Sequence, residues 1–210
     1  EYRRIRFSLD LSGEITNRYF SETPFVPQDK KDVENRSELI LTMQSTALAT
    51  RVEHARAKTL VIGVSGGLDS TLALLVAVRS MNLLRRNVKD VIAVTMPCFG
   101  TTARTKSNAV KLSESLGVTL KEVDISKAVI QHFKDIGQDE RVTDVTYENS
   151  QARERTQVLM DIANKTGGMV VGTGDLSELA LGWATYNGDH MSMYGVNSSV
   201  PKTLIRYLIS

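Results

Sequence analysis

The stretch that decides the fold is Thr59-Leu-Val-Ile-Gly-Val-Ser-Gly-Gly-Leu-Asp-Ser70. Its first half, residues 59–64, is a short run of apolar and β-branched residues, which is typical of a strand buried on both faces of a parallel sheet. Its second half is rich in glycine and serine, and a helical pattern follows at residues 68–81. The stretch therefore predicts a buried strand, a tight loop and a helix in direct succession.

The same alternation of strands and helices continues along the rest of the chain. Apolar runs at 90–96, 118–123 and 169–172 predict three more strands. Helical spacing predicts helices at 37–57, 103–116, 126–133 and 147–165. Parallel strands need connections of helical length, so this order predicts an α/β domain, a Rossmann-like three-layer sandwich with a mostly parallel sheet. In such sheets, ligands bind at the carboxyl ends of the strands.

Composition narrows the possible partners and compartment. The 210 residues, 41% of them hydrophobic, can bury one substantial core. The 26 basic and 24 acidic side chains are spread along the chain without a basic stripe, so we expect no nucleic-acid partner. No apolar run approaches the roughly 18 residues that span a bilayer, so we expect no membrane partner. Cys98 is the only cysteine, which excludes an internal disulfide framework and favours the cytoplasm.

The loop after the first buried strand has the chemistry of a phosphate-binding site. Gly66 and Gly67 allow positive φ and close backbone approach, so N–H groups can converge on an anion where the helix N-terminus adds partial positive charge. Ser65 and Ser70 add hydroxyl donors. Asp69 would repel a bare phosphate unless a divalent cation lay between them, so we expect Mg²⁺. The alternative is a simple tight turn, with Asp69 favoured by the helix dipole.

Two motifs carry a resemblance to a known family. Ser65-Gly-Gly-Leu-Asp-Ser70 resembles the signature of the ATP-pyrophosphatase superfamily, whose members cleave ATP between its α and β phosphates. The stretch Gly172-Thr-Gly-Asp-Leu-Ser-Glu-Leu-Ala-Leu-Gly-Trp-Ala-Thr-Tyr-Asn-Gly-Asp189 resembles the NAD synthetase pattern, and residues 97–109 and 148–155 are similar to further family segments in the same order. The sequence is identified as a member of the glutamine-dependent NAD synthetase family, within its synthetase domain of the ATP-pyrophosphatase (HUP) type.

The resemblance implies roles for individual residues. It implies that ATP is bound by the loop and two later residues, which together are Gly63, Val64, Ser65, Gly66, Gly67, Leu68, Asp69, Ser70, Thr173 and Lys202. It implies that the dinucleotide substrate is bound by Asn149, Arg153, Glu178, Trp183, Ala184, Thr185, Tyr186 and Asp189. Asp69 and Glu178 are the implied catalytic and Mg²⁺-binding residues, and carboxylates suit that ion.

Other roles stay open for several of these residues. Trp183 could be a packed core aromatic instead of a surface on which a nicotinate ring stacks. Arg153 and Arg155 could form a solvated helix face. Thr173 could be an ordinary turn residue, and Lys202 an ordinary surface lysine.

The resemblance also implies a reaction and a setting for it. The reaction is the ATP-dependent amidation of nicotinic acid adenine dinucleotide to NAD through an adenylate, with release of AMP and pyrophosphate, which makes the enzyme a carbon–nitrogen ligase. Ammonia would come from a glutaminase domain. Residues 1–30 resemble the connector after that domain, and residues 31–210 are expected to be the synthetase domain, cut short at its C-terminus. Family members form homo-oligomers, with residues 37–57 as a candidate contact surface.

Two rival functions stay open from the sequence. Another amidating or thiolating ATP-pyrophosphatase, such as a GMP synthetase, would share the phosphate loop but should lack the Gly182-Trp-Ala-Thr-Tyr186 unit. A non-catalytic nucleotide-binding module would have little need for two carboxylates, Asp69 and Glu178, beside bound phosphates.

Overall fold

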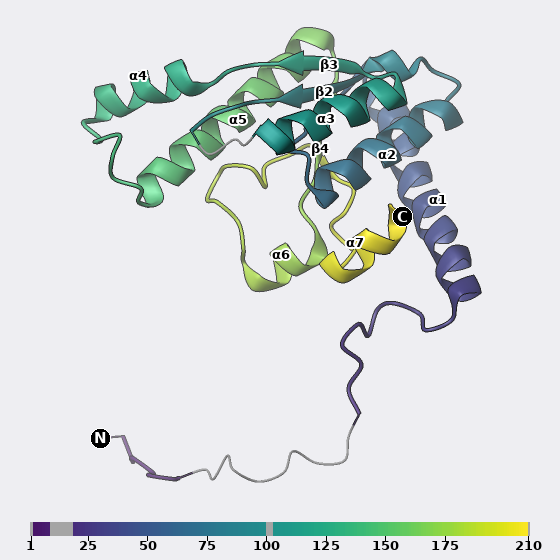
Figure 1. The fold of residues 1–210 in the computed structure, drawn as a ribbon, viewed down its shortest axis with the longest axis horizontal. Helices are drawn as coiled ribbons and strands as arrows, with labels where there is room; N and C mark the ends of the chain where they lie inside the picture. The colour runs from purple at the N-terminus through teal and green to yellow at the C-terminus, as the bar shows by residue number, and fades with distance from the viewer. Residues whose placement is uncertain (1, 9–18, 100–102, 210) are drawn as a thin grey trace.

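A parallel sheet lies at the centre of the chain in a computed structural model, which describes residues 2–8, 19–99 and 103–209 (Figure 1). The strand order is β3-β2-β1-β4-β5, and every pair of neighbouring strands is parallel. The strands are β1 (Leu60–Gly63), β2 (Val91–Thr95), β3 (Thr119–Glu122), β4 (Met169–Gly172) and β5 (Tyr194–Gly195). The four strands predicted from apolar runs are confirmed.

Helices connect and cover these strands. They are α1 (Lys30–Ala55), α2 (Leu68–Leu83), α3 (Ala103–Leu116), α4 (Ser126–Ile136), α5 (Val145–Thr166), α6 (Leu176–Leu181) and α7 (Lys202–Leu208), with a 3-10 turn at Val88–Asp90. The five predicted helices are confirmed. The first begins at residue 30, earlier than the predicted 37, because the Asp29 side chain accepts hydrogen bonds from the N–H groups of Lys31 and Asp32 at 2.9 and 3.1 Å. The patterns do not predict β5 or α6, which are too short to show a period.

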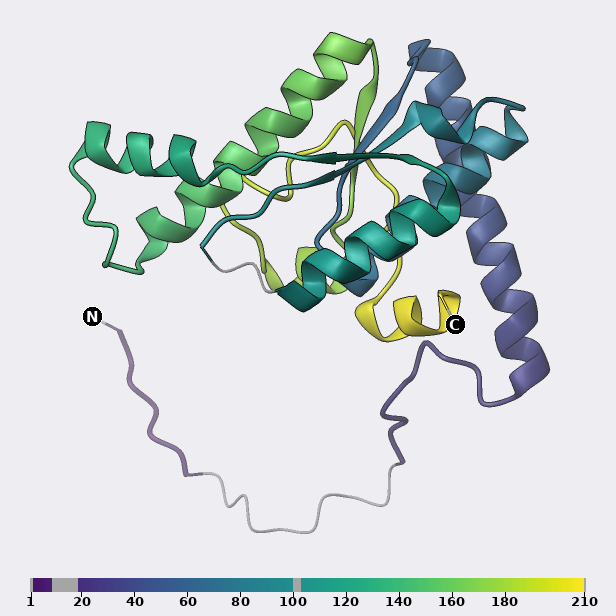
Figure 2. The same cartoon turned by 45° about the horizontal axis from the view of Figure 1, so that its top comes forward.

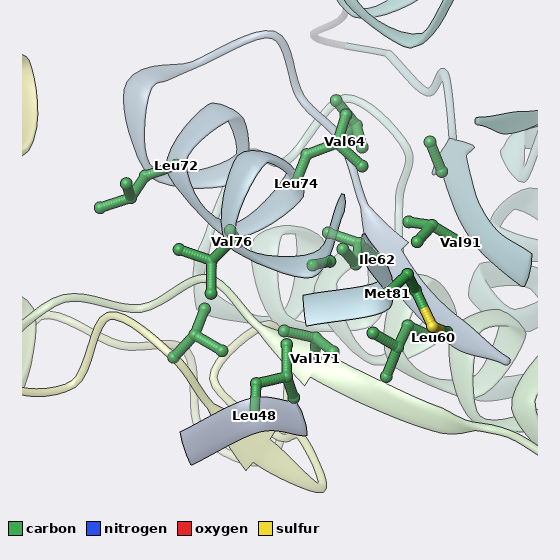
Figure 3. Packing of buried hydrophobic residues seen from close by; sticks show 14 of the residues in the cluster. Leu48, Leu60, Ile62, Val64, Leu72, Leu74, Val76, Met81, Val91 and Val171 are labelled. Carbon is green, nitrogen blue, oxygen red and sulfur yellow. The ribbon is translucent and has the colours of Figure 1, made fainter. Parts of the chain in front are cut away.

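The alternation of side chains along each strand builds two separate apolar layers. Leu60 and Ile62 of β1 pack in the cluster that includes Leu48 of α1 and Leu74 of α2, as Figure 3 shows. Val61 points to the other face, where the neighbouring strands and α5 bury it. Figure 2 shows α5 on one side of the sheet and α1 on the other. The predicted three-layer α/β sandwich is therefore confirmed.

The two halves of the sheet part toward the carboxyl ends of the strands. From β1 the chain goes on to β2 and β3 on one side, whereas β4 and β5 lie on the other side. The β1–β4 register pairs Leu60 with Met169 and Val61 with Val170 and then ends, although both strands run further. This is the kind of point at which open α/β sheets bind ligands.

Two further observations concern the chain as a whole. Residues 2–8 belong to no helix or strand, and Tyr2 and Phe7 there are exposed. Within the described ranges, the helices are all too short or too polar to cross a lipid bilayer.

Candidate functional site

A cavity of about 470 Å³ opens where β1 and β4 part. Its walls come from the carboxyl ends of β1, β2 and β4, from α2, α5 and α6, and from the chain after α6. Seven of the predicted ATP and metal residues line it, namely Gly63, Val64, Ser65, Asp69, Ser70, Thr173 and Glu178. The strand ends therefore bring together two motifs that lie about a hundred residues apart in the sequence.

The loop between β1 and α2 is folded tightly on itself. Gly66 has a φ of 80°, a left-handed conformation that glycine adopts without a steric penalty. The Gly67 N–H donates to Ser65 Oγ at 3.3 Å, and Ser70 Oγ–H donates to the Gly67 carbonyl at 3.2 Å. Because a helix leaves its first N–H groups without partners inside the helix, the start of α2 presents donors to the cavity edge.

Three carboxylates meet beside this loop. Asp69 comes from α2, Asp175 from the turn before α6, and Glu178 from the first turn of α6; one oxygen of each lies within 4.8 Å of the others. We call these three residues the carboxylate cluster. Asp69 Oδ1 is buried and has no hydrogen-bond partner among the described residues. A set of clustered carboxylate oxygens fits a hard divalent cation such as Mg²⁺.

Asp175 and Glu178 are held by a capping box at the start of α6. The Glu178 N–H donates to Asp175 Oδ1 at 3.0 Å, and the Asp175 N–H donates to Glu178 Oε2 at 3.2 Å. Asp175 is fully buried, whereas the side chains of Asp69 and Glu178 are 25% and 32% exposed. No role was predicted for Asp175, although its place three residues before Glu178 is the sequence signal of a capping box.

Lys202, at the start of α7, reaches all three members of the cluster. Its Nζ lies 2.6 Å from Asp69 Oδ2, 2.6 Å from Asp175 Oδ2 and 3.4 Å from Glu178 Oε1. Burial lowers the pKa of Lys202, but the close contacts with Asp175 and Asp69 outweigh burial, and the net pKa is raised. Burial likewise raises the pKa of Asp175, but its contacts with Lys202 prevail and the net pKa is lowered. Lys202 is therefore no ordinary surface lysine.

Arg155 and Asp189 form a two-pronged ion pair in the cavity wall. Arg155 Nε and Nη2 donate to the two Asp189 carboxylate oxygens at 2.8 and 2.7 Å, and these hydrogen bonds raise the pKa of Arg155. Both residues line the cavity. The interpretation of Arg155 as part of a solvated helix face is therefore wrong, and the pair joins α5 to the chain after α6.

The buried side-chain amide of Asn197 connects the segment after β1 to the segment after β4. Asn197 is fully buried, and its Nδ2 donates to the backbone carbonyls of Asp69 and Thr173 at 3.0 and 3.1 Å. Gln44 of α1 in turn donates from Nε2 to Asn197 Oδ1 at 3.2 Å and to the Val196 carbonyl at 2.7 Å. Sequence reasoning missed Asn197, since no local pattern connects it to Asp69, which is 128 residues away.

The predicted dinucleotide residues divide into two groups. Glu178 and Asp189 line the cavity. Trp183 and Tyr186, with exposed fractions of 79% and 73%, lie outside it, so Trp183 is not a core aromatic. The remaining predicted residues that do not line the cavity are Asn149, Arg153, Ala184 and Thr185 for the dinucleotide, and Gly66, Gly67, Leu68 and Lys202 for ATP.

Some of the residues outside the cavity still contact its wall. Arg153 Nε donates to the Tyr186 carbonyl at 3.2 Å, and Thr185 Oγ1 accepts from the Asp189 N–H at 3.2 Å. Residues 100–102, within the segment 97–109, lie outside the described residues.

Comparisons with known proteins agree with the motifs. The family model described as NAD synthase matches residues 40–209. The glutamine-dependent NAD(+) synthetase of Mycobacterium tuberculosis is 47% identical over 99% of this chain and 32% of its own length. The NH(3)-dependent NAD(+) synthetase of Chlorobium phaeovibrioides is 30% identical over 85% of this chain and 61% of its own length.

A solved structure agrees with the fold. The glutamine-dependent NAD+ synthetase of Acinetobacter baumannii, in complex with adenosine diphosphate, superposes with a TM-score of 0.76 at 31% identity. The match covers 82% of this chain and 32% of that one. The chain thus spans about a third of the length of the glutamine-dependent relatives that it matches.

Proposed function

Since this chain belongs to the NAD synthase family, we propose that it amidates nicotinic acid adenine dinucleotide to NAD at the expense of ATP, releasing AMP and pyrophosphate. The observation that carries the proposal is the meeting of Asp69 and Glu178 in one cavity wall beside the glycine-containing loop. A non-catalytic nucleotide-binding module would have little need for two carboxylates next to bound phosphates.

The proposed first step is the attack of the nicotinate carboxylate on the α-phosphorus of ATP, which gives an adenylate and pyrophosphate. This step needs no protein nucleophile, so the chain contributes positioning and charge stabilisation. Residues 63–70, through their N–H and hydroxyl groups, hold the departing pyrophosphate, and Thr173 contacts ATP from the opposite wall. Mg²⁺ held by Asp69 and Glu178 would neutralise phosphate charge. Ammonia then displaces AMP from the adenylate.

We propose that the dinucleotide binds along the cavity wall and the chain after α6. Glu178 and Asp189 face the cavity. Arg155, which holds Asp189 by two hydrogen bonds, presents that carboxylate in a fixed orientation. Trp183 and Tyr186 are exposed beside this wall and offer flat faces to the nicotinate ring. Asn149, Arg153 and the stretch 184–185 are proposed to contact the rest of the dinucleotide.

The proposal extends to the setting of the whole protein. We infer that residues 1–30 connect this part to a glutaminase domain, which supplies ammonia, and that residues 31–210 belong to the synthetase domain. The names of the relatives, glutamine-dependent and NH(3)-dependent, are the support for both ammonia sources. We place the activity in the cytoplasm, in a homo-oligomer.

The test supplies the full-length protein with ATP, Mg²⁺, ammonium and nicotinic acid adenine dinucleotide. We expect equal amounts of NAD, AMP and pyrophosphate, and no pyrophosphate when the dinucleotide is left out. Pyrophosphate release that does not depend on the dinucleotide would contradict the proposal. Asp69→Asn should abolish the reaction, whereas Asp161→Asn, the same change at an exposed carboxylate of α5, should leave it unchanged.

A further inference from the structure

The contacts of Lys202 resemble those of a bound cation. Its ammonium lies within 3.4 Å of an oxygen of each member of the carboxylate cluster, and no other cationic group is paired with the cluster in the described part of the chain. The oxygens that it contacts on Asp69 and Glu178 belong to the two residues that would hold Mg²⁺. A metal ion and the ammonium therefore compete for the same carboxylates.

The three carboxylates do not face the same space. Asp69 and Glu178 line the cavity, whereas Asp175 and Lys202 do not. Asp175 is fully buried behind them and is fixed by the capping box of α6. A cation that arrives through the cavity therefore meets Asp69 and Glu178 first, while the buried Asp175 contacts Lys202 from behind them.

From this arrangement we propose that Lys202 is the resident counter-cation of the cluster, that a divalent cation displaces it from Asp69 and Glu178, and that Asp175 is the positioning residue that retains it. The inference rests on the proposed function, because the site and its metal are those of that reaction. In the metal-bound protein, Lys202 stays paired with Asp175.

The charges of the group support this division of roles. Three carboxylates against one ammonium leave a formal charge of −2, which is balanced when one divalent cation is added. Without Asp175, the cluster could not neutralise the metal ion and Lys202 together. Buried charges are stable only when paired, so Asp175 is the charge that allows both cations to remain.

The backbone of Lys202 is placed so that only its side chain has to move. The Lys202 N–H donates to Ser177 Oγ at 3.1 Å, and the Val200 carbonyl accepts from the Leu176 N–H at 3.0 Å. These bonds tie the start of α7 to the start of α6, which Figure 1 shows side by side. The stem of Lys202 therefore begins at the same place with or without the metal ion.

The first experiment measures Mn²⁺ binding to the full-length protein without nucleotide, by the loss of the free-ion signal in electron paramagnetic resonance. Lys202→Met removes the competing ammonium and should tighten Mn²⁺ binding by about tenfold or more. Arg206→Met removes the same charge one turn further along α7 and should change the affinity by less than about twofold. Equal effects of the two substitutions would overturn the proposal. Lys202→Gln repeats the test should Lys202→Met not fold.

The second experiment separates a positioning role of Asp175 from direct metal binding. Asp175→Asn should weaken Mn²⁺ binding about tenfold when Lys202 is present, because the lysine then turns to Asp69 and Glu178. In the Lys202→Met background the same change should cost only about twofold, since the residues couple through the lysine. An equal loss in both backgrounds would make Asp175 a metal ligand and would overturn its positioning role.

Both measurements are independent of NAD synthesis. If the protein makes no NAD but Lys202→Met tightens Mn²⁺ binding, the proposed function fails and the competition between lysine and metal stands. If the protein makes NAD and Lys202→Met leaves Mn²⁺ binding unchanged, the function stands and the competition is refuted.

Discussion

Replacing Asn197 by alanine tests how strongly the two halves of the site depend on one buried amide. The side chain is fully buried and takes part in hydrogen bonds with Asp69, Thr173 and Gln44. Each such bond contributes about 0.5–1.5 kcal/mol net, so Asn197→Ala should reduce the free energy of unfolding by about 2–4 kcal/mol. For a domain of this size, that corresponds to a melting temperature lower by about 5–15 °C.

The same substitution should impair the reaction beyond its effect on folding. The two carbonyls that Asn197 holds belong to Asp69 and Thr173, which line the cavity from the segments that follow β1 and β4, so losing the amide lets these two segments shift relative to each other. A shift of about 1 Å at a reacting centre can cost about a hundredfold in rate, and we expect kcat/KM for ATP to fall by about 10- to 100-fold.

Thermal unfolding and steady-state kinetics of the full-length protein measure both effects. Ser198→Ala is the matched control, because Ser198 donates a single hydrogen bond, to the Gly195 carbonyl at 3.1 Å, and its loss should cost about 1 kcal/mol or less. Asn197→Asp, which places a carboxylate against two carbonyls, should be more harmful at pH 8 than at pH 5. The reasoning is refuted if Asn197→Ala melts and reacts like the Ser198→Ala control.

Three further predictions concern the loop, the cavity wall and pH. Gly66→Ala forces a side chain into a φ of 80°, so it should cost about 1–2 kcal/mol of stability and weaken ATP binding in calorimetry. Arg155→Met frees Asp189 and should raise the KM for the dinucleotide about tenfold while the KM for ATP changes little, as initial rates would reveal. Asp175 has a lowered pKa, so its stabilising contact with Lys202 is complete above about pH 4 and is lost as pH falls through the folded-state pKa. In denaturant unfolding, the destabilisation caused by Asp175→Asn should therefore be full at pH 7 and should shrink as the pH is lowered through that pKa.

Sequence patterns predict the sheet and most helices because each predicted element carries its own signal. The strand at Leu60–Gly63 is a continuous apolar run, and the glycines after it show where the chain must turn. The carboxyl-edge location of the site follows from the parallel order alone. Asp69 and Glu178 were assigned from motifs, and the structure brings them together.

The parts that were missed depend on contacts between distant segments. Lys202 is a predicted ATP-binding residue, but its ion pair with Asp69, 133 residues away, is not predicted. Asn197, which donates to the Asp69 carbonyl across 128 residues, is not predicted at all. Contacts between residues so far apart in the sequence cannot be predicted from local periodicity or composition. The sequence around Asp175 predicts a helix cap. Its contact with Lys202 at 2.6 Å is visible only in the three-dimensional structure.

In the capping box of α6, the two carboxylate oxygens of Glu178 have different contacts. Oε2 accepts from the Asp175 N–H and secures the helix, while Oε1 is the oxygen that faces Lys202. The carboxylate can therefore ligate a cation in monodentate fashion without uncapping α6. Aspartate would be one methylene too short to reach both partners, and glutamine could keep the cap but would lose the charge. Glutamate at position 178 therefore combines the length that the cap needs with the charge that a bound cation would need.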